Sequence, residues 1–162
     1  DEPEAVDLVA AIEDTHLAFA QQIARNGVQF CYEGPELQYV TSQPLQLTQF
    51  LNSLFSNAIE AMPAGGVLRA QVSVQDGQRT VMLLSDTGKG MTQQQERMVF
   101  KPFFTTKQGG LGVGLALVQR IMERFGGSVS LSSREEEGTR VSLTFNIAAG
   151  GDHGTQHPGS RG

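Results

Sequence analysis

The sequence predicts a single α+β domain, and two kinds of repeating pattern lead to this prediction. Long segments carry apolar residues at three- and four-residue steps, which is typical of helices with one buried face. Short apolar or alternating runs bounded by turn residues predict strands. The helical segments are residues 4–25, 44–62 and 115–125, and the strand segments are residues 28–33, 37–41, 67–75, 79–85, 128–133 and 140–147. A chain of 162 residues can bury one full core, so we expect one ordered domain over residues 1–148.

The composition argues against several functional classes. The formal net charge is −5 and no run of basic residues is present, which disfavours a nucleic-acid partner. No apolar run is long enough to span a bilayer, so we expect no direct membrane contact by this domain. The single Cys31 cannot form an internal disulfide, which is typical of a reducing compartment and predicts a cytoplasmic domain. Because the chain opens on Asp1 without an initiator Met, we expect a fragment of a longer protein, which could itself be membrane-tethered.

The first helical segment, residues 4–25, ends at Asn26-Gly27, a pair that is typical of a helix C-cap. It contains His16, and a lone His on a helix is most simply a surface or packing residue. Gly34-Pro35 is a turn signal between the two short strands that follow.

The second helical segment begins near Pro44, with Ser42 as its expected N-cap. Its buried face is predicted to consist of Leu47, Phe50, Leu51, Leu54, Phe55, Ala58 and Met62. An adjacent stripe holds Ser53, Asn57, Glu60 and Ala61. This stripe is either solvated surface or the rim of a nucleotide site, where the side-chain oxygen of Asn57 could bind Mg²⁺.

A hairpin around Asp76-Gly77 leads into residues 86–91 (DTGKGM). The carboxylate of Asp86 follows a strand and could accept a hydrogen bond from the exocyclic amine of a purine. Gly88 and Gly90 would let the backbone approach a flat base closely. The alternative is a simple strand-ending turn, for which Asp-x-Gly is also typical.

Two further segments complete the pattern. Residues 100–107 (FKPFFTTK) join an aromatic cluster to a polar stretch, and Pro102 argues against a continuous helix there. Residues 109–114 (GGLGVG) run directly into a helix, whose first N–H groups and positive dipole end form a ready anion site. Beyond residue 148 there is no apolar anchor, so we expect residues 149–162 to be a disordered tail.

Three familiar phosphate sites are excluded by their own motifs. A P-loop needs Ser or Thr after Gly-Lys, whereas Gly90 follows Lys89. The dinucleotide fingerprint needs a third glycine where Leu117 stands. The protein-kinase motifs are absent.

Four motifs remain, in a fixed order along the chain: LFSNAIEAM (54–62), DTGKGM (86–91), KPFFTTK (101–107) and GGLGVGL (109–115). They resemble the N, G1, F and G2 boxes of the ATP-binding catalytic domain of bacterial sensor histidine kinases, and the wording of the F box is most similar to the nitrogen-regulation type. The resemblance covers residues 6–147. It implies a two-layer fold in which a mixed, largely antiparallel five-stranded sheet is covered on one face by about three helices.

The resemblance also implies residue roles. Asn57 would bind Mg²⁺, Asp86 would accept from the adenine amine, and Thr139 would support the same contact through a water molecule. Lys107 would reach the γ-phosphate, so that Asn57 and Lys107 are the expected catalytic residues. The other expected ATP contacts are Ala61, Gly88, Gly90, Thr105, Thr106, Gly110, Leu111, Gly112, Val113 and Gly114.

The chain departs from the family pattern at two points. Ser53 stands where these kinases usually have a second Asn and where the hydrolysing ATPases of the superfamily have a catalytic Glu, so no base for water is evident. His16 does not match the phosphoacceptor motif, so the acceptor is expected on a separate dimerisation domain, with a response regulator downstream. Two alternatives stay open: a nucleotide-gated binding module, and an anti-sigma serine kinase of the same superfamily.

Overall fold

The computed structural model describes residues 2–101 and 114–148. Its main sheet has the strand order β2-β4-β5-β7-β6, and only the β2–β4 pair is parallel. The strands are β2 (Val28–Glu33), β4 (Gly66–Gln75), β5 (Arg79–Asp86), β6 (Ser128–Arg134) and β7 (Gly138–Asn146). The predicted mixed, largely antiparallel five-stranded sheet is therefore confirmed.

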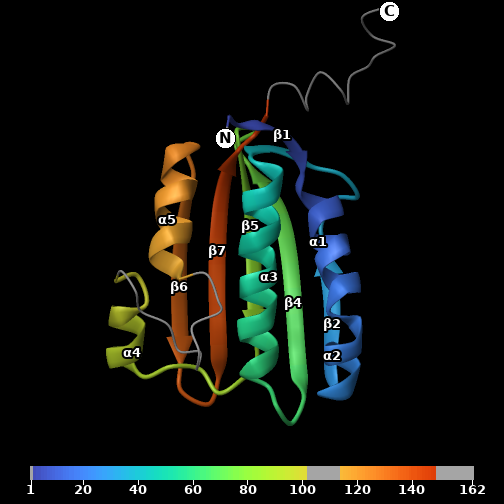
Figure 1. Ribbon diagram of the computed structural model, residues 1–162, viewed down its shortest axis with the longest axis vertical. Helices are drawn as coiled ribbons and strands as arrows, with labels where there is room; N and C mark the ends of the chain where they lie inside the picture. The colour runs from blue at the N-terminus through green and yellow to red at the C-terminus, as the bar shows by residue number, and fades with distance from the viewer. Residues whose placement is uncertain (1, 102–113, 149–162) are drawn as a thin grey trace, which may run out of the picture.

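One face of this sheet carries the helical layer (Figure 1). It is formed by α1 (Leu8–Ala18), α2 (Ala20–Arg25), α3 (Pro44–Glu60) and α5 (Leu115–Arg124). The core between the layers is centred on α3, whose predicted buried face is confirmed. Phe55 of α3 packs against Phe30 of β2, and His16 stacks on Phe30 with ring centroids 4.1 Å apart. His16 is thus the packing residue that the sequence predicts.

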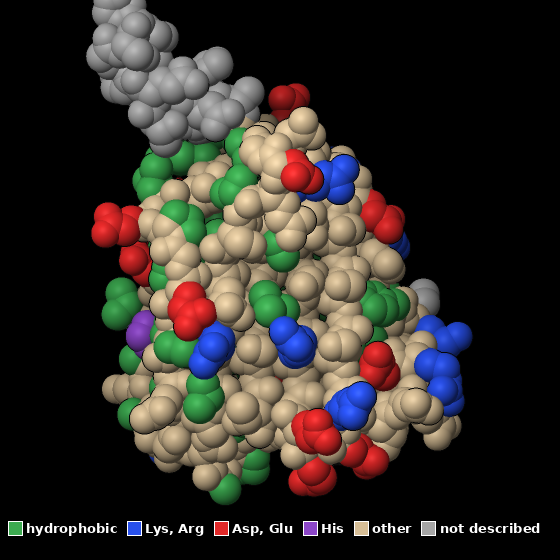
Figure 2. Space-filling view, turned by 180° about the vertical axis from the view of Figure 1, so that it is seen from behind, with side chains coloured by type: hydrophobic (Ala, Val, Ile, Leu, Met, Phe, Trp, Pro, Cys, Tyr) green, Lys and Arg blue, Asp and Glu red, His purple; other side chains and the backbone are tan. Residues whose placement is uncertain are grey.

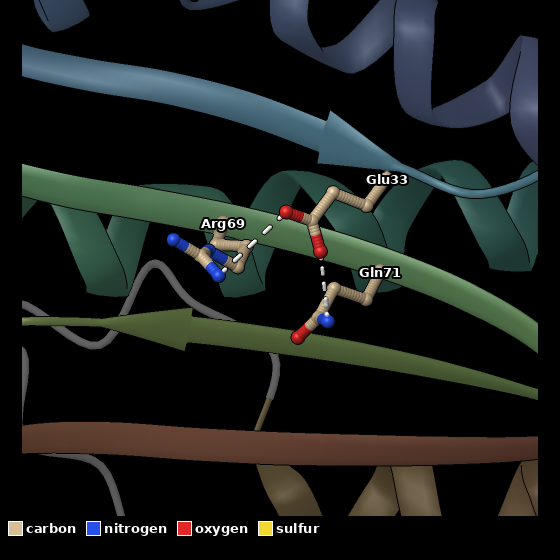
Figure 3. Close-up of polar contacts among 3 residues, drawn as sticks. All are labelled: Glu33, Arg69 and Gln71. Atoms are coloured by element: carbon tan, nitrogen blue, oxygen red, sulfur yellow. Dashed lines mark hydrogen bonds and ion pairs between the residues drawn. The ribbon is translucent and has the colours of Figure 1, made fainter.

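The other face of the sheet has no described helix over it, and Figure 2 shows a largely polar surface there. Strand β4 illustrates why the two faces of the sheet differ. Leu68, Ala70 and Val72 are buried under the helices, whereas the alternate residues point to the other face and are not buried. In Figure 3, Glu33 accepts from the Gln71 amide at 3.0 Å and lies 3.7 Å from the Arg69 guanidinium. Such exposed pairs contribute little stability, about 1 kcal/mol at most.

The N-terminal residues differ from the prediction. Glu4–Asp7 form strand β1 and not the first turn of a helix, and β1 pairs antiparallel with β3 (Tyr39–Ser42). Asp7 then caps α1, because its Oδ1 accepts from the Val9 N–H at 3.1 Å. The same oxygen accepts from the N–H of Gln38, the residue before β3, at 3.2 Å. Apolar spacing over four residues does not separate a helix from a strand, and the pairing with β3 decides between them. The rest of the predicted helix is divided into α1 and α2 at Phe19.

The predicted helix cap at Ser42 is wrong by one residue. Gln43 is the N-cap of α3, and its Oε1 accepts from the N–H groups of Leu45 and Gln46 at 3.0 and 3.2 Å. Ser42 is instead buried at the end of β3. Serine is the better cap by local preference, but its place in the small sheet overrides that preference. Pro44 occupies the first turn of α3 as predicted.

Helix α4 (Gln93–Met98) was not expected from the sequence. Thr92 and Gln95 form a capping box, in which each side chain accepts from the other residue's N–H at 3.0 Å. The helix has six residues and buries none of them, so it carries no apolar period that would have predicted it. Figure 1 places α4 beside the lower end of β6.

The remaining boundaries agree with the prediction to within two residues. The β4–β5 hairpin turns at Asp76 and Gly77, which have φ of 55° and 65°. Gly126, with φ of 81°, ends α5 as predicted. In the described chain, no helix combines the length and apolar character that a membrane span requires. The predicted tail at residues 149–162 lies outside the described residues.

Candidate functional site

A cavity of about 430 Å³ lies between the C-terminal half of α3, the ends of β5 and β7, α4 and the start of α5. Its volume is in the range typical of small-molecule sites. It is lined by Leu54, Asn57, Ala58, Glu60, Ala61, Leu84, Asp86, Lys89, Gly90, Met91, Gln95, Val99, Gly114, Leu115, Leu131, Thr139 and Val141. The cavity therefore brings together residues from the predicted N box, G1 box and G2 box with Thr139.

The lining combines apolar walls with several polar side chains. Leu84, Leu131 and Val141 come from the helix-facing side of the sheet, and Met91 and Val99 come from the segment that includes α4. The polar side chains Asp86 and Thr139 lie on neighbouring strands, directly opposite one another in the β5–β7 register. Apolar walls with a few placed polar groups suit a flat, partly polar ligand such as a nucleobase.

Asp86 is the last residue of β5, and its Oδ1 accepts from the Gly88 N–H at 2.8 Å. Burial raises the pKa of the Asp86 carboxyl above its ordinary value, while the backbone N–H groups of Gly88 and Thr139 act in the opposite direction. The burial effect is the largest of the three. A partly desolvated carboxylate facing a cavity is a strong acceptor for a ligand N–H, and such perturbed groups concentrate at functional sites.

The two glycines of the G1 box are required by close backbone contacts. A side-chain carbon at Gly88 would collide with the carbonyl oxygen of Ala61, which already accepts from the Lys89 N–H at 3.0 Å. Gly90 has φ of 67°, and a side chain there would collide with the carbonyl oxygen of Arg134. The glycines thus hold the G1 segment between the end of α3 and the β6–β7 hairpin. The sequence predicted close approach to a ligand, whereas these contacts are to the protein itself.

Asn57 is exposed at the mouth of the cavity, on the stripe that the sequence predicted. Among the described residues, no group of three His, Cys, Asp or Glu side chains could hold a metal ion. Magnesium does not need such a group, because it is often held by one or two protein oxygens together with substrate phosphates and water. The amide oxygen of Asn57 fits that mode of binding. Ser53 is buried and does not line the cavity.

Several predicted ligand residues lie outside the described residues and stay predictions. They are Thr105, Thr106, Lys107, Gly110, Leu111, Gly112 and Val113. Of the predicted glycine loop, Gly114 is described, and it is the N-cap of α5 without a side-chain cap hydrogen bond. The first N–H groups of α5 therefore start at the cavity, which Gly114 and Leu115 both line.

The sequence did not single out several lining residues. Gln95 and Val99 belong to the α4 segment, and the Thr92–Gln95 capping box was the signal that could have located it. Leu131 and Val141 follow from strand alternation once the helix-facing side of β6 and β7 is known. Ser133 was also missed: its hydroxyl lies 2.8 Å from that of Thr139. A serine within a strand carries no sequence signal for this contact.

A family model described as histidine kinase-, DNA gyrase B- and HSP90-like ATPase matches residues 42–149. The chain belongs to this family. The match includes every described residue of the cavity, from Leu54 to Val141. Together with the fold, it identifies an ATP-binding catalytic domain of the histidine-kinase type. The nitrogen-regulation subtype stays a prediction.

Similar proteins and structures agree with the family. The chain is 31% identical over 147 residues to the sensor histidine kinase ZraS of Salmonella typhi. This alignment covers 90% of this chain and 32% of that protein. It is 34% identical over 121 residues to sporulation kinase D of Bacillus subtilis, covering 70% of this chain and 24% of that protein. The nucleotide-free catalytic domain of histidine kinase ThkA superposes with a TM-score of 0.80 at 26% identity, covering 91% of this chain and 97% of that one. This chain spans about a third or less of the two curated relatives.

The raised pKa of Asp86 predicts a pH-dependent stability difference between wild type and Asp86→Asn. A carboxyl whose pKa is higher in the folded state favours folding below its unfolded pKa, about 3.9, and this contribution is lost as the pH rises through the folded pKa. The free energy of unfolding of Asp86→Asn, relative to wild type, should therefore increase between acidic and neutral pH. Urea titrations across this range measure the difference. A difference that is constant, or that shrinks with rising pH, would contradict the assigned environment of Asp86.

Proposed function

We propose that this domain binds Mg-ATP and transfers the γ-phosphoryl group to a histidine on a separate phosphoacceptor and dimerisation domain. From that histidine the phosphoryl group would pass to a response regulator. The observation that carries the proposal is the half-buried Asp86 carboxylate beside the apolar walls of the cavity, with Asn57 at the mouth. The similarity to sensor kinases supports the same proposal.

The cavity favours a nucleotide whose base carries an exocyclic amine. Asp86 accepts from the amine, and the apolar side chains of Leu84, Leu131 and Val141 contact the base. Burying a base against such walls contributes about 25 cal/mol per Å² of apolar area. Among purines with a substituent at position 6, the carboxylate favours the 6-amine of adenine, since a 6-oxo purine would place an acceptor against it. Hydrogen bonds to an ionised group are among the stronger ones, roughly 1.5–3 kcal/mol.

The phosphates would extend toward Asn57 and the start of α5. Asn57 would hold Mg²⁺ through its amide oxygen, and the metal would neutralise charge on the phosphates. Phosphoryl transfer of this kind depends mainly on positioning and on charge stabilisation. The predicted role of Lys107 at the γ-phosphate belongs to the same proposal. Ser53 offers no carboxylate to activate water, so the proposal is transfer to an acceptor and not hydrolysis.

The environment in which this chemistry takes place is also part of the proposal. We assign the domain to the cytoplasm, where ATP and response regulators are present, and leave open whether the full-length protein is anchored to a membrane. We assign no nucleic-acid partner, because the chain has a net charge of −5.

Nucleotide binding is the first expected outcome. At a free Mg-ATP concentration of about a hundred times Kd, the free energy of unfolding should rise by about 2.7 kcal/mol, which corresponds to roughly 2–4 °C in Tm for a domain of this size. Asp86→Asn should abolish the shift, because an amide cannot receive the same charge-assisted bond. Asp76→Asn is the matched control, since Asp76 is exposed in the hairpin turn, and it should keep the full shift. No shift in wild type, or an unchanged shift in Asp86→Asn, would argue against the site.

Phosphotransfer is the second expected outcome, and it separates the proposal from its alternatives. The domain is mixed with the isolated acceptor domain of the same protein and γ-labelled ATP. Acid-labile, base-stable label on the acceptor supports the histidine kinase. Acid-stable label would indicate a serine kinase of the anti-sigma type. Tight ATP binding without any label would indicate a nucleotide-gated binding module.

A further inference from the structure

Ser133 lies on β6 directly opposite Thr139 in the β6–β7 register and does not itself line the cavity. Its hydroxyl oxygen accepts from the Met91 N–H at 2.9 Å and donates to the carbonyl oxygen of Gly138 at 3.1 Å. The same oxygen is 2.8 Å from Oγ1 of Thr139. The Ser133 N–H donates to Glu96 at 3.2 Å. Ser133 thus joins the G1 segment, α4 and the β6–β7 hairpin at one point.

The protons in this cluster can be assigned by counting. A serine hydroxyl has one proton to donate and two lone pairs that accept. The carbonyl oxygen of Gly138 can only accept, so the bond to it uses the Ser133 proton. The 2.8 Å contact with Thr139 is then a hydrogen bond only if Thr139 is the donor. In this arrangement the two lone pairs of Ser133 receive Met91 N–H and Thr139 O–H, and every short contact has one proton.

This assignment decides what Thr139 offers to a ligand. Its only hydroxyl proton is directed back toward Ser133, so its oxygen can present lone pairs alone to the cavity that it lines. Asp86, directly opposite in the β5–β7 register, is also an acceptor when ionised. Where β5 and β7 pair at the cavity, the two strands therefore present two acceptors side by side. An exocyclic amine has two N–H groups and matches such a pair.

We propose that Ser133 is a positioning residue that sets base selectivity, because it holds Thr139 as an acceptor and so favours a 6-amino purine over a 6-oxo purine. The inference rests on the proposed function of the cavity as a nucleotide site. With Ser133 in place, the 6-oxygen of inosine triphosphate meets two acceptors on β5 and β7 and receives no hydrogen bond from either, which is a costly arrangement for a buried group. Without it, the Thr139 hydroxyl is free to rotate and donate to that oxygen.

The test compares the Kd values for ATP and inosine triphosphate, both with Mg²⁺, by competition against a fluorescent nucleotide. Ser133→Ala should reduce the preference of wild type for ATP by about tenfold, the factor that one recovered hydrogen bond provides. Ser133→Thr keeps a hydroxyl and should restore the wild-type ratio. Ser132→Ala is the matched control, because Ser132 is the exposed neighbour on the same strand and should leave the ratio unchanged.

The ratio separates selectivity from a merely structural role. If Ser133 only stabilises the hairpin, Ser133→Ala will weaken both nucleotides by the same factor and leave the ratio unchanged, which overturns the inference. Combining Ser133→Ala with Thr139→Val should give the same ratio as Thr139→Val alone, since the proposed effect passes through Thr139. If Ser133→Ala does not fold, Ser133→Cys replaces it, because a thiol of similar size is a weak donor and acceptor.

The result for wild type separates a failure of the proposed nucleotide site from a failure of the proposed role of Ser133. A wild-type domain that prefers ATP, combined with an unchanged ratio in the folded Ser133 variant, refutes the role of Ser133 and leaves the proposed function intact. A wild-type domain that binds neither nucleotide refutes the proposed function and this inference with it.

Discussion

The candidate site depends on one carboxylate that is partly removed from water at the end of a strand. Asp86 ends β5 where that strand is paired with β7, and its charge is supported by backbone N–H groups from Gly88 and Thr139. A partly buried carboxylate is costly to keep ionised, and these donors offset the cost only in part, since its pKa remains raised. The carboxylate also lines a cavity with apolar walls, where its remaining lone pairs can accept from a ligand. Because the ionised carboxylate is costly to hold in this partly buried position, a hydrogen bond from a ligand N–H stabilises it more than it would in water.

Close backbone contacts fix the position of that carboxylate. Gly88 lies against the carbonyl of Ala61 at the end of α3, and Gly138 lies against the backbone of Asp86, so that a side chain at either glycine would collide. Ser133 adds one side-chain hydrogen bond between the β6–β7 hairpin and the G1 segment, to Met91, and a second within the hairpin, to Gly138. The shape of the cavity therefore depends on how α3, the sheet and the hairpin pack together. Asp86 cannot move far unless those elements separate.

The sequence predicted those features whose cause is local. The period of α3, the Asp76-Gly77 turn and the glycine end of α5 all follow from spacing or turn chemistry, and the structure agrees. The grouping of Asn57, Asp86 and Thr139 needed the family resemblance, because they are far apart in the chain and meet only through α3 and the β5–β7 pairing.

The features that could not be predicted depend on partners distant in the chain. Residues 4–7 are a strand because β3 pairs with them, and Ser42 is a strand end and not a cap for the same reason. The role of Ser133 depends on hydroxyl and carbonyl groups contributed by the opposite strand of its hairpin and on an N–H from the G1 segment.

The most direct measurement of the central claim is a crystal structure of this domain with Mg²⁺ and a non-hydrolysable ATP analogue. We expect the adenine amine within about 3 Å of an Asp86 carboxylate oxygen and the Asn57 amide oxygen on the metal at about 2.1 Å. A base bound away from Asp86, or an Asn57 side chain directed away from the metal, would contradict the claim.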